Sequence, residues 1–154
     1  MTVFLSFLLV LNVIFTCLLF LRFYKKRKLF DDRYAMIMAA TASGGVSLVL
    51  SMLIYFLFPI DLASISFVTA TVGGLIGVGF GSLVKFQSLL SGFFHGVIGG
   101  LMGTMLGAVV KDPSLCSLPS AYFQQVTDNV IAFSLFGTFI VISTIGLLAF
   151  SLRV

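Results

Sequence analysis

The sequence predicts an all-α membrane protein: a bundle of about five transmembrane helices in which the third and fourth form a glycine-striped antiparallel hairpin. Three observations support this fold class. Hydrophobic residues make up 60% of the 154 residues and charged residues only 9%, whereas about a quarter of a soluble chain is charged. The apolar residues form long uninterrupted stretches of the length that a helix needs to cross a bilayer, about 20 residues. Two of these stretches carry the same glycine motif.

The predicted spans follow one another along a single polytopic membrane domain, residues 1–154. In chain order they cover residues 3–21, 34–58, 62–84, 89–110 and 130–152. The first ends before Arg22. The second ends at Pro59, which cannot donate a backbone hydrogen bond and therefore suits a loop better than a membrane helix. A short turn separates the third span from the fourth, and the polar segment 111–129 precedes the fifth.

Basic residues gather on one side of the predicted membrane. Six of them flank the loop between the first two spans: Arg22, Lys25, Lys26, Arg27, Lys28 and Arg33. Lys85 lies in the turn between the third and fourth spans, Arg153 follows the fifth, and only Lys111 falls on the other side. Because basic loops face the cytoplasm, we expect a plasma-membrane protein whose N-terminus lies outside the cell and whose C-terminus lies in the cytoplasm. The same charges attract anionic lipid, which explains the net charge of +4 without nucleic acid as a partner.

One glycine motif occurs twice. The first copy, at 73–85, is GGLIGVGFGSLVK, and the second, at 99–111, is GGLMGTMLGAVVK. Since a short turn joins the two spans, the copies run in opposite directions and form an inverted repeat. On each helix the glycines share one face, because residues three and four apart lie on the same side. The predicted helix-packing residues are Gly73, Gly77, Gly81, Gly92, Gly96, Gly99, Gly103 and Gly107. Small residues let two backbones approach closely, so we expect the third stripe to pack against the fourth.

The remaining spans differ in how well they suit the interior of a bundle. The second carries small residues at three- and four-residue spacing, such as Ala40, Gly44 and Ser47, and the fifth carries Gly137 and Thr138. The first is rich in Leu and Phe. We therefore expect spans two to five to form the centre of the bundle and the first to lie at its edge, facing lipid on most sides.

The inverted repeat favours two classes of function. A duplicated helix inserted in opposite directions is a minimal form of the inverted symmetry of many transporters. It predicts a small oligomeric transporter or channel with glycine-rich helices at its core. Alternatively, the stripes only hold the bundle together or bind another membrane protein, which predicts a non-transporting assembly or accessory subunit. In either case the expected partners are the lipid bilayer and a second copy of the chain or another membrane protein.

Catalytic chemistry has little support in this sequence. The chain contains no Glu, its five Asp residues fall in loops or at span ends, and His95 is its single histidine. An acid–base or nucleophilic site needs a second chemical group in reach of such a histidine. We expect no enzymatic activity and no cofactor.

Soft-metal transport is a third, minor hypothesis, since thioether and imidazole groups bind monovalent copper. His95 and Met102 are seven residues apart, so they lie on nearly the same side of the fourth helix. The alternative is that Met102 is a flexible apolar filler and that His95 bonds to backbone or water near the headgroups. Cys17 and Cys116 are expected toward opposite membrane faces, so no disulfide should join them.

Overall fold

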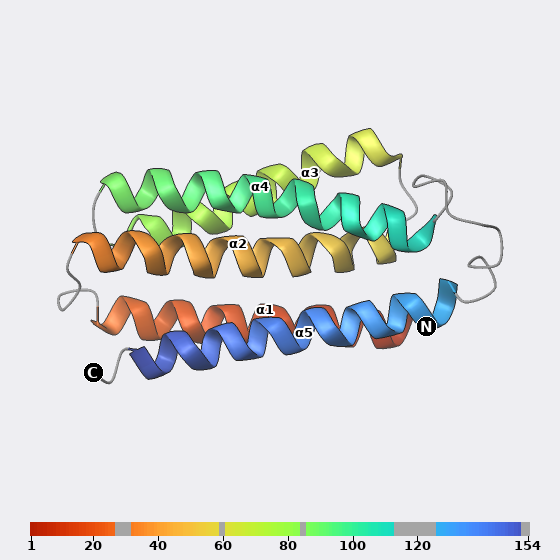
Figure 1. Ribbon diagram of the computed structural model, residues 1–154, viewed down its shortest axis with the longest axis horizontal. Coiled ribbons are helices and arrows are strands. Elements are labelled where there is room, and N and C mark those ends of the chain that lie inside the picture. The colour runs from red at the N-terminus through yellow and green to blue at the C-terminus, as the bar shows by residue number, and fades with distance from the viewer. Residues whose placement is uncertain (27–31, 59–60, 84–85, 113–125, 152–154) are drawn as a thin grey trace.

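The computed structural model describes residues 1–26, 32–58, 61–83, 86–112 and 126–151, and within these ranges the chain is helical without any strand. It forms α1 (Thr2–Lys26), α2 (Asp32–Leu57), α3 (Leu62–Gly81), α4 (Phe86–Lys111) and α5 (Val126–Ser151) (Figure 1). Each of these helices is long and apolar enough to cross a membrane. The prediction of an all-helical chain with five candidate spans is therefore confirmed.

The helix ends differ from the predicted ones by a few residues. α1 continues past Arg22 to Lys26, because Arg and Lys are good helix formers. α5 begins at Val126, within the segment expected to be a loop. α3 ends at Gly81, where the backbone N–H of Ser82 donates to the carbonyl oxygen of Val78 and closes the last turn.

α2 is the central helix of the bundle. It contacts the other four helices and lies between two layers, α3 with α4 on one side and α1 with α5 on the other (Figure 1). In its most apolar stretch 61% of the residues are buried, against 22% in α1 and 28% in α5. α1 is the least buried of the five candidate spans, but α3 and α5, each 28% buried, are little more enclosed, so burial does not set the first span apart. Since α3 and α4 occupy the small-residue face of α2, Gly137 of α5 packs on Val49 and Met52 at another face.

Two apolar clusters of buried side chains hold the layers together. The first includes Leu5, Leu8, Val49, Leu53 and Val130. The second includes Leu19, Phe23, Ala42, Phe80 and Leu148. Each cluster draws on helices from both layers, so the α1–α5 layer is attached to α2 mainly by apolar contacts between bulky side chains.

One polar side chain is completely buried between α1 and α5. Asn12 has no exposed surface, and its Nδ2 donates to the carbonyl oxygen of Leu8 at 2.8 Å and to Thr138 Oγ1 at 3.0 Å. Thr138 in turn donates to the carbonyl oxygen of Ser134 at 2.9 Å. Asn12 Oδ1 accepts no hydrogen bond from a described residue. The Asn12–Thr138 hydrogen bond therefore links α1 to α5 through two residues that are 126 positions apart in the chain.

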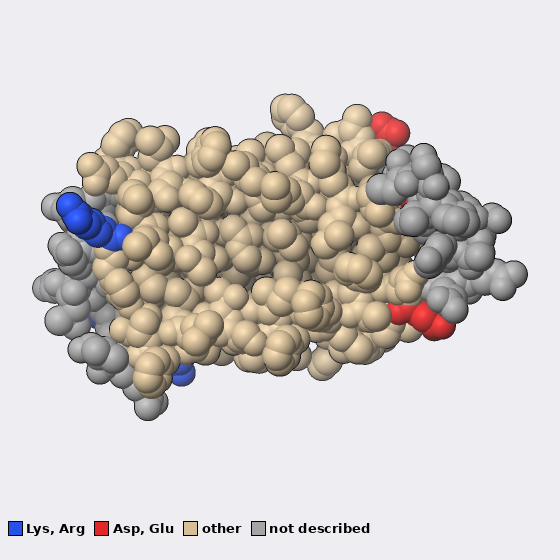
Figure 2. Space-filling view, viewed as in Figure 1, with Lys and Arg blue, Asp and Glu red and all other residues tan. Residues whose placement is uncertain are grey.

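Charged side chains lie at the two ends of the molecule, with an uncharged surface between them (Figure 2). Arg22, Lys25 and Arg33 lie at the end where α1 stops and α2 begins, whereas Asp61, Asp112 and Asp128 lie at the opposite end. Lys111 lies at that opposite end too, with its Nζ 5.6 Å from the centre of the Tyr55 ring. The side chain of Lys26 and the residues Pro59, Arg27, Lys28, Lys85, Cys116 and Arg153 lie outside the described part of the chain, as does most of the segment 111–129.

Candidate functional site

The candidate site is the junction where the small residues of α2, α3 and α4 meet. α3 and α4 run antiparallel, and their contacts keep a constant register of four-residue steps. The facing pairs are Thr69 with Gly100, Gly73 with Gly96, Gly77 with Gly92, and Gly81 with Ser88. A Cβ built on Gly73 or Gly77 would overlap the carbonyl oxygen of its partner, and the reverse holds as well. The two backbones are therefore in direct contact, an approach that small residues permit in membrane helices.

The second half of the α4 stripe faces α2 instead of α3. A Cβ on Gly99 would lie 2.6 Å from the carbonyl oxygen of Gly44, and one on Gly103 would overlap that of Leu48. A Cβ on Gly107 would lie 3.1 Å from the Tyr55 ring. The expected packing of the third stripe on the fourth therefore accounts for Gly92 and Gly96, whereas Gly99, Gly103 and Gly107 pack on α2. The α4 glycines in fact form two four-residue rows: Gly92, Gly96 and Gly100 meet α3, whereas Gly99, Gly103 and Gly107 meet α2. The second row is displaced from the first by one residue, about 100° around the helix, so it faces a different neighbour.

The two copies of the repeated motif consequently have different surroundings. Glycines of the first copy, Gly73 and Gly77, pack on Gly96 and Gly92, which precede the second copy. In the second copy, Gly103 packs on α2. The same sequence pattern therefore packs at two different interfaces, α3 with α4 and α4 with α2. The two copies do not pair with each other as symmetric halves.

Buried hydroxyl groups lie at the same junction. On α2 they follow a four-residue spacing, at Ser43, Ser47 and Ser51, each at most 1% exposed. Thr69 of α3 and Thr104 of α4 are completely buried, and their Oγ1 atoms lie 2.6 Å apart. The carbonyl oxygens of Ile65 and Gly100 lie 2.9 and 3.0 Å from these hydroxyls. Because each hydroxyl carries one proton, one threonine donates to the other while the second donates to its own helix.

Sequence reasoning gave no role to this threonine pair. The available signal was spacing: Thr69 precedes Gly73 by one four-residue step, and Thr104 follows Gly100 by the same step. Both threonines therefore extend rows of small residues at four-residue spacing. Their mutual contact depends on the register of α3 against α4, which spacing within one helix does not determine.

The two residues of the soft-metal hypothesis lie on the outer surface of α4. His95 is exposed, and its Nδ1 lies 2.8 Å from the carbonyl oxygen of Ser91. Met102 is 58% exposed. Cys17 is exposed on α1. Within the described ranges, no three His, Cys, Asp or Glu side chains come together as a metal-binding group.

We expect Met102→Leu to change stability by less than about 1.5 kcal/mol, because it keeps volume and apolarity. His95→Ala is expected to have a modest effect, since it removes one hydrogen bond within α4. Copper(I) retention by the purified protein checks both variants against the wild type. Retained copper that is lost on either substitution would contradict the structural role and establish the thioether and imidazole as ligands.

These features define a class, an all-helical protein with five candidate membrane spans and a backbone-packed core of three of them. No protein-family model, curated protein or solved structure matches the chain. Its function is therefore argued from its own residues.

Proposed function

We propose that this chain is an integral membrane protein whose α2–α3–α4 unit is a rigid scaffold, and that it acts as a non-transporting assembly or accessory subunit. The observation that carries the proposal is that all eight striped glycines are packed against another helix. Each of them meets backbone or side-chain atoms of another helix of the same chain within about van der Waals distance. Glycines in such contacts are occupied by packing and leave no bare backbone for a passing solute.

The outer surface supports the same proposal. Large apolar side chains project outward from α3 and α4, among them Phe67, Leu75, Phe86 and Met105, which are 77%, 72%, 76% and 64% exposed. An apolar surface of this kind is suited to lipid and to the helices of another membrane protein or of a second copy. A rigid unit with such a surface meets the physical needs of an assembly subunit.

The experiment that tests this function compares flux with assembly. Purified protein is reconstituted in liposomes, and flux of K⁺, Na⁺, Cl⁻ and Cu⁺ is measured against protein-free vesicles. In parallel, cross-linking in intact cells and quantitative mass spectrometry measure the stoichiometry with other membrane proteins. We expect background flux and a fixed stoichiometry with one partner or with a second copy. Saturable flux of any of these ions would overturn the accessory function.

Transport remains the second candidate because of the buried hydroxyls of Ser43, Ser47, Ser51, Thr69 and Thr104. Hydroxyls at a helix junction are able to replace part of the hydration shell of a solute. Thr69→Val combined with Thr104→Val distinguishes the two functions, because valine keeps the shape and removes both hydroxyls. A scaffold loses only a hydrogen bond, on the order of 0.6 kcal/mol in a membrane. A transporter loses flux while its folded yield is retained.

We further propose that the protein lies in the plasma membrane with its N-terminus outside the cell and its C-terminus in the cytoplasm. Arg22, Lys25 and Arg33 at one end of the bundle support this orientation, since basic ends face the cytoplasm. A reporter fused after Val154 is expected to behave as cytoplasmic, and Cys116 should react with an impermeant maleimide added to intact cells. External labelling of a cysteine introduced next to Lys26 would reverse the assignment.

A further inference from the structure

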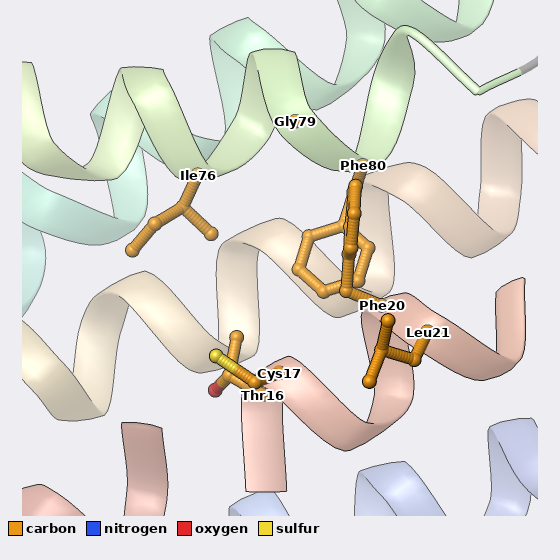
Figure 3. A pocket seen from close by; sticks show the side chains of 7 residues that line it. All are labelled: Thr16, Cys17, Phe20, Leu21, Ile76, Gly79 and Phe80. Carbon is orange, nitrogen blue, oxygen red and sulfur yellow. The ribbon is translucent and has the colours of Figure 1, made fainter. Parts of the chain in front are cut away.

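A crevice lies between α1 and α3 on the flank of the bundle, near the basic end. It is lined by Cys17, Phe20 and Leu21 from α1 and by Ile76, Gly79 and Phe80 from α3 (Figure 3). Its volume is about 330 Å³. Phe80 makes edge-to-face contacts with Phe20 and Phe23, at centroid distances of 5.7 and 5.8 Å. The aromatic contacts join α1 to α3 at this end.

The crevice presents an almost entirely apolar surface. The hydroxyl of Thr16, which also borders it, donates to the carbonyl oxygen of Asn12 at 2.8 Å and so is satisfied within α1. Gly79 contributes width, because a Cβ there would lie 3.9 Å from the Phe20 ring. Leu21 and Cys17 are exposed at the mouth. A suitable ligand for this surface is a hydrocarbon chain that enters from the flank of the bundle, between α1 and α3.

Positive charge lies directly beyond the mouth of the crevice. Lys25 follows Leu21 by four residues, so it continues the same face of α1 toward the basic end, and it is exposed. Arg22 on α1 and Arg33 in the first turn of α2 lie at the same end of the bundle. From Cys17 to Lys25 the helix rises roughly 12 Å, close to half of the roughly 30 Å hydrocarbon core of a bilayer. An acyl chain in the crevice would place its headgroup at the level of Lys25.

We propose that this crevice binds one acyl chain of an anionic phospholipid from the basic-end leaflet, with the headgroup phosphate paired with Lys25. The charge selects the occupant. Basic residues at the end of an apolar crevice attract an anionic headgroup more strongly than a zwitterionic one. The proposal rests on the membrane insertion proposed above. It is independent of whether the chain transports a solute.

The chain contains no Trp, so one introduced Trp gives a single fluorescence reporter. Leu21→Trp places it at the mouth of the crevice. Leu147→Trp is the matched control: it is the same substitution near the basic end of α5, at a side chain that is 71% exposed. Each variant is reconstituted in vesicles of phosphatidylcholine containing either brominated phosphatidylglycerol or brominated phosphatidylcholine. Quenching by the two brominated lipids gives their relative binding constant at each reporter.

At Leu21→Trp we expect a preference of roughly five-fold for phosphatidylglycerol, the scale set by one basic side chain at a membrane surface. Adding Lys25→Gln should reduce it toward unity, whereas Lys111→Gln, the same charge change at the opposite end, should leave it unchanged. At Leu147→Trp the preference should stay near unity throughout. Equal quenching by both lipids at Leu21→Trp, or no response to Lys25→Gln, overturns the lipid site while membrane insertion stands. Absence of quenching at both reporters overturns membrane insertion itself.

A second measurement avoids any change in the lining. With Cys116→Ser, Cys17 is the single thiol, and its modification by a membrane-permeable maleimide is timed in vesicles with and without phosphatidylglycerol. A bound acyl chain covers Cys17, so we expect slower modification with phosphatidylglycerol and a loss of that difference in Lys25→Gln. Equal rates in the two vesicle types contradict the proposal, even where Leu21→Trp does not fold.

Discussion

Replacing Gly77 with Leu is expected to separate α3 from α4 and to destabilise the fold by more than about 3 kcal/mol, beyond the usual range for overpacking. A Cβ at this position would overlap the carbonyl oxygen of Gly92 and would lie 2.6 Å from its carbonyl carbon and 2.9 Å from Phe93 Cα. All of these obstacles are backbone atoms, so no rotamer change relieves the clash. Moving the helices apart also breaks the neighbouring contact of Gly73 with Gly96. The measurement is the thermal unfolding midpoint in detergent, followed by size-exclusion chromatography.

Two other glycines are controls for this substitution. A Cβ on Gly146 meets no heavy atom within 4 Å, and one on Gly79 meets only Phe20, at 3.9 Å. We expect Gly146→Leu to be near neutral and Gly79→Leu to be milder than Gly77→Leu. If the three variants unfold at the same temperature, close backbone contact between α3 and α4 does not stabilise the protein.

Gly103→Leu is expected to destabilise the fold by about 2 to 3 kcal/mol, through separation of α4 from α2. A Cβ there would overlap the carbonyl oxygen of Leu48 and would lie 2.8 and 3.0 Å from its carbonyl carbon and Cα. Because these are again backbone atoms, shortening the side chain with Leu48→Ala should not rescue the variant. The same detergent unfolding measurement checks the loss, and rescue by Leu48→Ala would contradict the backbone contact.

A disulfide cross-link distinguishes which helix pair each substitution separates. Thr69→Cys and Thr104→Cys, with Cys17 and Cys116 replaced by Ser, should form a disulfide across α3 and α4, since the threonine oxygens lie 2.6 Å apart. We expect Gly77→Leu to reduce this cross-link and Gly103→Leu to leave most of it. Equal loss in both variants would mean that α4 moves as a whole away from α2 and α3.

The number of candidate spans and the helical class were predictable because both depend on local properties of the chain. Inside a bilayer every backbone N–H and C=O group needs a partner within its own segment, so a long apolar stretch such as 89–110 has one stable form, a helix. Helix ends were less predictable. α1 continues through Arg22 and α5 begins at Val126, because charged and polar residues at a span end are compatible with both helix and loop.

The sequence by itself predicted that a neighbouring helix comes close to each striped glycine, because a row of small residues permits close helix packing. It did not determine which neighbour. Gly77 and Gly103 occupy similar motifs, yet one packs on α4 and the other on α2. The Thr69–Thr104 and Asn12–Thr138 hydrogen bonds likewise required the tertiary structure. A glycine has no side chain whose shape or charge selects a partner, so only the arrangement of all five helices decides where each stripe packs.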